Sequence, residues 1–255
     1  MKTICNIQNL CFSYTGKNEI LSDISFSIHE KEIVGILGKN GSGKSTLLDL
    51  LAGYLAPQNG KILIDGIKAQ DISANERSKI ISYIEQKKIK IPSYYTVEEF
   101  IIEGRRPFRP FGFYKKEDYE LLEEKMKCCN VHEYKNRLLR NLSGGEFQRC
   151  VFARAMMKQA KLYLFDEPCS AMDIKYQKDF FKTARKLLET ETGSILISIH
   201  DINLAVQNCD RIILLSDGKI KYDGNASNIS ESILSLAFDT PVSSENKDRL
   251  SFFYY

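Results

Sequence analysis

The sequence predicts an α/β fold in which helices pack on a mostly parallel β-sheet, and three observations support this prediction. An apolar run at 32–37 continues through a glycine-rich stretch into a second apolar run at 47–54, which is the pattern of strand, turn and helix. Two later apolar runs, at 162–165 and 194–199, are continuous rather than alternating, as expected for strands buried on both faces of a parallel sheet. Residues 87–142 differ, because charged and aromatic side chains mix there at helical spacing.

This pattern divides the chain into a core and an insertion. We expect a single domain at 1–242, with a core at 1–86 and 160–225 and a helical subdomain at 87–159. A C-terminal tail at 243–255 carries no motif that we can interpret.

The N-terminal region is expected to form an antiparallel β subdomain. Ile24, Phe26 and Ile28 alternate with polar residues, which predicts a strand with one buried face. A second strand at 62–64 runs into Asp65-Gly66, a pair typical of tight hairpin turns.

The phosphate-binding pattern G-x-x-x-x-G-K-[ST] lies between the first predicted core strand and its helix. Its glycines let the backbone wrap an anion closely, and the free N–H groups at the helix start point toward it. We expect the lysine to reach the β- and γ-phosphates of a nucleoside triphosphate and the serine that follows to ligate Mg²⁺. The residues concerned are Gly38, Lys39, Asn40, Gly41, Ser42, Gly43, Lys44, Ser45 and Thr46.

Composition narrows the class of protein. The chain has 255 residues, 43% of them hydrophobic, and a net charge of only +3, so composition does not favour a nucleic-acid partner. The apolar runs are far shorter than the ~20 residues of a membrane span, and the N-terminus lacks the apolar core of a secretory signal. Seven cysteines without a C-x-x-C pair indicate reduced thiols, and we expect Cys128-Cys129 to pack in a helix. These features predict a soluble intracellular protein.

Capping boxes mark the helix starts that we expect downstream. Ser73 and Thr96 each precede a glutamate by three residues, and a strand is expected at 79–84 after the first of these helices. From 115 to 127 a helix is predicted, with Tyr119, Leu122 and Met126 packing as its apolar stripe.

Arginines and phenylalanines gather at 105–113. They could stack on nucleic acid, form a groove for a protein partner, or pack with arginine stems over rings. We favour a protein partner.

Ser143 and Glu146 again have capping-box spacing, although Gly144 and Gly145 in a first turn weaken a helix by about 1 kcal/mol each. Bare backbone at a helix start is useful if it must approach an anion; a plain turn is the alternative.

Charged residues follow the two buried strands at the edge where α/β proteins place their sites. Asp166 suits Mg²⁺, Glu167 suits polarising an attacking water, and a solvated pair is the alternative. His200, at the end of the later strand, is more suited to function than His29 or His132. A hairpin about Asp217-Gly218 is expected at 212–220.

Read together, these residues resemble the ATP-binding-cassette (ABC) family, from Met1 to about Val242. Residues 38–46 are similar to its Walker A motif, Gln86 to its Q-loop glutamine and 142–146 to its signature motif. Residues 162–167 are similar to Walker B with its glutamate, Ser170-Ala171-Met172-Asp173 to the D-loop and His200 to the switch histidine.

The resemblance implies an ATPase. It implies that two copies pack head to tail, so that Ser143, Gly144 and Gly145 of one copy face the ATP held by Lys44 of the other. Glu167 would be the general base, with His200 and Gln86 arranging the γ-phosphate and water. Ser45, Gln86 and Asp166 would hold Mg²⁺. Tyr14 falls where the family stacks an aromatic ring on adenine, and Asp173 belongs to the D-loop at the shared site.

Within the family, 97–107 with its Gly104-Arg105-Arg106-Pro107 resembles ATPases of iron-chelate, haem and cobalamin importers. Such subunits lie on the inner face of the membrane, bound to a permease that an extracytoplasmic binding protein serves. Divalent-metal importers have a similar stretch, and a soluble cassette acting on nucleic acid or ribosomes is a second class. A small-molecule kinase, a third, would not need Ser143-Gly144-Gly145. The sequence departs from the family at Glu85, Phe147, Cys169 and Met172.

Overall fold

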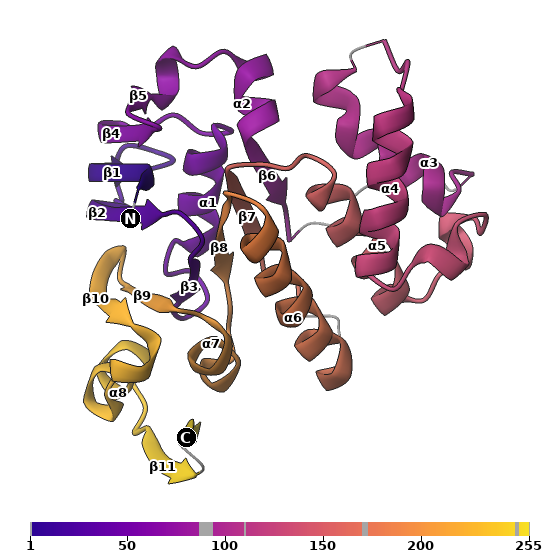
Figure 1. Ribbon diagram of the computed structural model, residues 1–255. Coiled ribbons are helices and arrows are strands. Elements are labelled where there is room, and N and C mark those ends of the chain that lie inside the picture. The colour runs from indigo at the N-terminus through magenta and orange to yellow at the C-terminus, as the bar shows by residue number, and fades with distance from the viewer. Residues whose placement is uncertain (1, 87–93, 110, 170–172, 248–249, 255) are drawn as a thin grey trace. The chain divides into compact units, whose positions relative to one another are not determined.

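The computed structural model describes residues 2–86, 94–109, 111–169, 173–247 and 250–254 (Figure 1). By its internal contacts the chain divides into two compact units. The first comprises Met1–Ile72, Leu164–Glu167 and Ser194–Tyr255, and the second comprises Ser73–Tyr163 and Pro168–Gly193. The domain limits expected from the sequence remain a prediction.

The first unit contains a small antiparallel sheet with strand order β2-β1-β4-β5. In β2 the side chains of Ile24, Phe26 and Ile28 are buried, as their alternation predicts. Asp65 and Gly66 form the predicted tight turn, with φ angles of 49° and 80°. The strands are β1 (Thr3–Phe12), β2 (Leu21–His29), β4 (Asn59–Ile64) and β5 (Ile67–Lys68).

The larger sheet has its centre in the same unit, where neighbouring strands follow the order β10-β9-β3-β8-β7. β3 runs parallel to β8 and β9 on either side, and β10 returns antiparallel to β9 through the predicted Asp217-Gly218 turn. Every residue of β3 and β8 is buried, which explains why apolar residues do not alternate with exposed polar ones in either strand. The strands are β3 (Ile33–Leu37), β7 (Leu162–Asp166), β8 (Ser194–Ser198), β9 (Arg211–Ser216) and β10 (Lys219–Asn225).

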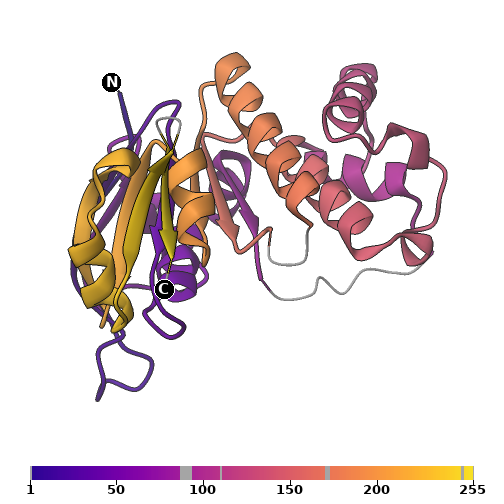
Figure 2. The same ribbon diagram turned by 90° about the horizontal axis from the view of Figure 1, so that it is seen from below.

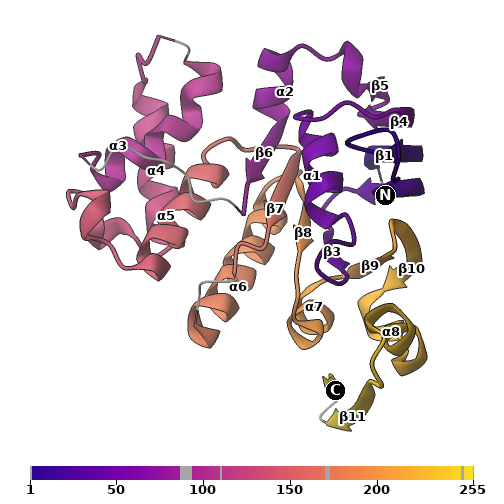
Figure 3. The same ribbon diagram turned by 180° about the vertical axis from the view of Figure 1, so that it is seen from behind.

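The helices of this unit follow strands of the larger sheet (Figure 3). α1 (Lys44–Ala52) follows β3, α7 (Ile202–Asn208) follows β8, and α8 (Glu231–Phe238) comes after β10. Beyond α8 the chain forms a hairpin of β11 (Ser243–Lys247) and β12 (Leu250–Tyr254), where the sequence indicated only a tail.

The second unit is mostly helical (Figure 2). All three predicted capping boxes are present, at Ser73, Thr96 and Ser143. Phe100, Leu122 and Phe152 pack in its core. Its elements are α2 (Ala74–Ile80), β6 (Ile81–Ile84), α3 (Val97–Ile102), α4 (Lys116–Cys128), α5 (Gly144–Met156) and α6 (Ile174–Thr190). Short 3₁₀ turns occur in both units, at Ala69–Asp71, Glu103–Phe108, His132–Tyr134, Leu139–Asn141 and Ala226–Asn228.

Two local expectations for this unit are wrong. The strand expected at 79–84 begins at Ile81, because the capped helix before it extends through Ile80. Tyr119 does not join the buried stripe of α4, since its side chain is 46% exposed while Leu122 and Met126 are buried. A tyrosine needs a polar partner when it is buried, and the helix surface leaves its hydroxyl in water.

Candidate active site

Two glycines of the phosphate loop have backbone conformations that other residues rarely adopt. Gly38 has a φ of 154°, and a Cβ there would lie 2.2 Å from the carbonyl oxygen of Leu215. Gly43, the N-cap of α1, has a φ of 103°, and its Cβ would lie 2.7 Å from a methyl of Leu21. The loop therefore keeps its shape only with glycine at these two positions.

Lys44 is 5% exposed and lies back along the loop. Its Nζ donates to the carbonyl oxygens of Gly38 at 2.7 Å and Lys39 at 3.0 Å. Burial lowers the pKa of Lys44, while the carboxylates of Glu167 and Asp166 oppose that shift. An anion placed in the loop would favour the charged ammonium further.

Ser42 supports an anion at the same place. Its hydroxyl oxygen is buried, and within the described part of the chain it has no hydrogen-bond partner. A buried hydroxyl without a partner is costly and calls for an explanation such as a ligand. A phosphate oxygen in the loop would accept its hydrogen.

The carboxylates at the end of β7 are held by the neighbouring strand β8. Ser198 donates from Oγ to Asp166 Oδ1 at 2.6 Å and accepts the backbone N–H of Glu167 at 2.9 Å. Asp166 is 3% exposed, and Glu167 has a φ of 51°, in the left-handed region. This strained backbone turns the chain directly after Asp166.

Glu167 and His200 meet within the first unit, since a carboxylate oxygen of Glu167 contacts Nε2 of His200. The Glu167 side chain is 10% exposed, and that of His200 is 41% exposed. Glu167 is also near enough to Lys44 to affect its pKa. A glutamate held by an imidazole beside the phosphate loop is suited to general-base chemistry on a water molecule.

Tyr14 is tied to the loop from the side of β1. Its hydroxyl lies 3.2 Å from Oγ1 of Thr46, and its ring meets the edge of Phe12 at 4.9 Å between centroids. The side chain remains 61% exposed, so a ring face is available for stacking.

The structure thus brings together Tyr14, the phosphate loop, Asp166, Glu167 and His200 in the first unit. The remaining predicted site residues lie in the second unit. Gln86 is exposed just after β6, and Ser143 caps α5, where its Oγ accepts the N–H of Glu146 at 3.3 Å. A Cβ on Gly144 would meet nothing within 4 Å among the described atoms, so this helix start is open. Asp173 caps α6, while Ser170, Ala171 and Met172 lie outside the described residues.

Sequence reasoning missed two neighbours of the site. Ser198 is one of two serines in an otherwise apolar strand, and only its place at the end of that strand could have signalled it. Asp239 forms an ion pair with Lys39 of the loop from 200 residues away, and no sequence pattern connects the two.

Magnesium fits this arrangement. Among the described residues no group of three or more His, Cys, Asp or Glu side chains could hold a metal by itself. A carboxylate and a hydroxyl beside a triphosphate are the usual protein ligands of Mg²⁺, which takes its other ligands from phosphate and water. Asp166 carries such a carboxylate and Ser45 such a hydroxyl, both in the first unit.

The described helices contain none that is long and apolar enough to cross a membrane.

The chain matches one family model, described as ABC transporter, over residues 21–170. It is 31% identical over 243 residues to an uncharacterized ABC transporter ATP-binding protein of Methanocaldococcus jannaschii, covering 95% of this chain and 94% of that one. A petrobactin import ATP-binding protein of Bacillus anthracis is 35% identical over 80% of this chain and 75% of its own. A cobalamin import ATP-binding protein of Halobacterium salinarum is 32% identical over 88% of this chain and 56% of its own.

Some relatives are longer. The chain spans 39% of the length of a putative ABC transporter ATP-binding protein of Bacillus cereus with which it is 34% identical. Among solved structures, a putative metal-chelate type ABC transporter matches with a TM-score of 0.83 and 26% identity, over 99% of this chain and 96% of that one. A dimeric bacterial ABC transporter cassette matches with a TM-score of 0.76 and 28% identity, over 88% and 99%.

Proposed function

The chain belongs to the ABC transporter family and is an ATPase, and from this premise we propose that it powers an importer of iron chelates, haem or cobalamin. The observation that carries the enzymatic part is the grouping of Lys44, Asp166, Glu167 and His200 at one loop of the first unit. Two relatives named for petrobactin and cobalamin import support the proposal of an importer, and so does the similar structure of a putative metal-chelate type ABC transporter.

In the proposed mechanism the phosphate loop binds the triphosphate and Lys44 neutralises its charge. Glu167 accepts a proton from the attacking water, and His200 holds that carboxylate in place. Ser198 fixes the backbone at Glu167 so that its side chain keeps this direction. Tyr14 stacks on the base. Mg²⁺, held by Ser45 and Asp166, would screen the charge on the phosphates.

The second unit is proposed to complete the site of another copy. The open start of α5, at Ser143, Gly144 and Gly145, presents backbone N–H groups that suit a γ-phosphate. Asp173 would lie at the same interface. The dimeric cassette among the solved structures supports a homodimer that shares two ATP sites.

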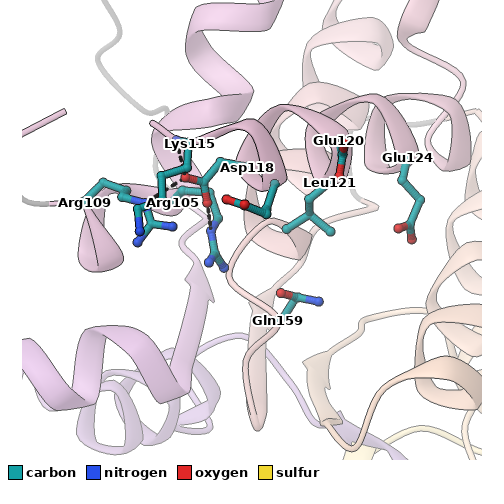
Figure 4. Close-up of a pocket in the computed structure, with 9 residues that line it drawn as sticks. Arg105, Arg109, Lys115, Asp118, Glu120, Leu121, Glu124 and Gln159 are labelled. Atoms are coloured by element: carbon teal, nitrogen blue, oxygen red, sulfur yellow. Dashed lines mark hydrogen bonds and ion pairs between the residues drawn. The ribbon is translucent and has the colours of Figure 1, made fainter. Parts of the chain in front are cut away.

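We place the permease contact at 105–113, with Gln86 contributing. The arginines there serve the unit itself, because Arg105 and Arg109 donate to the two oxygens of Asp118 at 2.9 and 2.8 Å (Figure 4). Burial alone would raise the pKa of Asp118, but the Lys115 N–H and both arginines hold it below its ordinary value. Phe111 and Phe113 are 84% and 81% exposed, so this segment offers apolar surface to a membrane partner.

Co-purification from detergent extracts tests this function. The chain should bring down a polytopic permease and should lie on the inner face of the membrane, with an extracytoplasmic binding protein acting on the other side. Phe111→Ser with Phe113→Ser should release the permease, while Tyr54→Ser, at an aromatic that is 64% exposed in the first unit, should not. A divalent-metal importer or a soluble cassette on ribosomes remains the alternative, and repeated extraction without any permease would favour the latter.

The shared site has its own test. In the Glu167→Gln background, ATP should drive the purified chain into a dimer, and Ser143→Arg should prevent it because a long charged side chain fills the space for the partner's phosphate. Dimerisation that survives Ser143→Arg would argue against a shared site.

A further inference from the structure

The C-terminal hairpin of β11 and β12 is attached to the helix that follows His200. β12 packs against α7, and the end of the chain lies beside this helix (Figure 3). Phe253 is 7% exposed, whereas its neighbours Phe252 and Tyr254 are 38% and 52% exposed. The alternation of the strand therefore directs Phe253 into the first unit.

A single side chain makes this attachment specific. Asn203 Nδ2 donates to the carbonyl oxygen of Phe253 at 2.8 Å, and the backbone N–H of Phe253 donates to Asn203 Oδ1 at 2.7 Å. The amide of Asn203 thus pairs with one residue of β12 as a neighbouring strand would, and few side chains other than asparagine offer both groups at this length.

The hairpin is anchored at the start of β11 as well, through Ser244 in that strand and Val242 just before it. The N–H of Val242 donates to Ser235 Oγ at 2.8 Å, and the N–H of Ser244 donates to Glu231 Oε1 at 2.6 Å. Both acceptors belong to α8. A two-stranded hairpin alone is only marginally stable in water. Here it is held in place by its contacts with α8 and α7.

α7 needs such support. It has seven residues, fewer than an isolated helix requires for stability in water. Ile202 and Ala205 bury its inner side, Asp201 caps its start by accepting the N–H of Leu204, and Asn203 holds it from the side of the hairpin. His200 directly precedes the cap residue Asp201, so a shift of α7 would move the backbone that carries the imidazole in contact with Glu167.

We infer that Asn203 is a positioning residue for ATP hydrolysis, which acts through α7 and the C-terminal strand to hold His200 against Glu167. This inference rests on the proposed role of His200. Gly38 and Gly43 of the phosphate loop lie against Leu215 and Leu21. We therefore expect the loss of the Asn203 attachment to leave nucleotide binding unchanged.

The test compares Asn203→Ala with Asn208→Ala in the purified full chain. Asn208 lies on the same helix, and its Nδ2 donates to Leu204 O rather than to the hairpin. Asn203→Ala should lower kcat by about tenfold, since a small misplacement of a catalytic group costs up to about 10²-fold. The Kd for ATP should stay unchanged. Asn208→Ala should have wild-type kcat.

A double-mutant cycle with His200→Ala separates positioning from a general loss of structure. If Asn203 acts through His200, Asn203→Ala should lower kcat no further in the His200→Ala background. An equal loss in both backgrounds, or wild-type kcat in Asn203→Ala, would overturn the inference. Wild-type kcat in His200→Ala alone would instead refute the role of His200 and the inference with it.

Asn203→Asp guards against misfolding of the alanine variant. It keeps the acceptor for the Phe253 N–H and replaces the donor by an oxygen that faces the Phe253 carbonyl. Asn203→Asp should therefore lower kcat, while the chain still folds and unfolds on heating in the same main transition as the wild type. A wild-type kcat in this variant would also count against the inference.

Discussion

Ser198 and Asp166 are joined across neighbouring strands by a hydrogen bond of 2.6 Å, in which the serine hydroxyl donates to a carboxylate that is 3% exposed. The same hydroxyl accepts the N–H of Glu167. One serine of β8 thus holds both acidic residues of the site, and it fixes Glu167 in a left-handed conformation that a glutamate adopts only under constraint.

Ser198→Ala should therefore impair both stability and hydrolysis. Leaving the buried Asp166 and the Glu167 N–H without this partner should reduce the free energy of unfolding by about 1–3 kcal/mol. ATP hydrolysis should slow while ATP binding persists, since Lys44 and the loop are untouched. Urea unfolding and steady-state ATPase assays measure the two effects.

Ser194→Ala is the matched control for that variant. Ser194 lies at the start of the same strand, is equally buried, and donates to the carbonyl oxygen of His29 away from the site. It should lose stability without a change in kcat. If both variants lost kcat alike, the link through Ser198 would have no special role.

The sequence predicted the local parts of this site well, and the reason is physical. A phosphate loop, a capping box or a strand end is specified by residues close together in the chain, as at Gly38–Thr46 and Ser143–Glu146. The strands predicted at 162–165 and 194–199 are β7 and β8, and their ends carry Asp166 and His200 as expected. The α/β fold with its antiparallel N-terminal sheet is confirmed.

What the sequence missed depends on contacts between distant residues. The attachment of Asn203 to Phe253 crosses 50 residues, and the pair of Lys39 and Asp239 crosses 200. Polar residues in such contacts have the same sequence signature as solvated ones. The C-terminal hairpin was missed for the same reason, because its buried Phe253 has meaning only against α7. The roles of individual site residues stay predictions.

Glu167→Gln should separate binding from chemistry. Glutamine keeps the size of the side chain and a contact for His200 but cannot accept a proton, so ATP should still bind. Hydrolysis should slow by about 10²–10⁴-fold if the carboxylate acts mainly as a general base. Single-turnover assays with radiolabelled ATP measure the step, and normal turnover would remove Glu167 from that role.

Asp239→Asn should increase affinity for ATP. Asp239 lies at the end of α8 with its side chain 82% exposed, and its carboxylate pairs with the ammonium of Lys39 in the phosphate loop. Without the pair, Lys39 is available to an anion in the loop, and Kd for ATP should fall by at most about fivefold, as suits an exposed ion pair. Isothermal titration at low salt would detect this.

Two controls accompany the Asp239 variant. The gain should shrink at high salt, because exposed charges are screened. It should also vanish in a Lys39→Ala background, where there is no ammonium to release. A gain that persists in that background would mean that Asp239 repels the nucleotide directly rather than through Lys39.

Lys158 gives the second unit a distinctive pH dependence. Burial, and then the nearby Arg154 guanidinium, lower the pKa of Lys158 to about 8, and its Nζ donates to the carbonyl oxygen of Ile81 at 3.1 Å. The folded chain therefore releases this proton near pH 8, while the unfolded chain keeps it until about pH 10.4. Between these values the unfolded state binds more protons, so this group makes the free energy of unfolding rise with pH.

Relative to Lys158→Met, the wild type should gain stability from about pH 8 to 10, by at most about 1.4 kcal/mol per pH unit. Below pH 7 the difference in the free energy of unfolding between the two proteins should not change with pH. Urea unfolding across this range checks the sign; a difference that falls or stays constant above pH 8 would show that the ammonium remains charged in the folded chain.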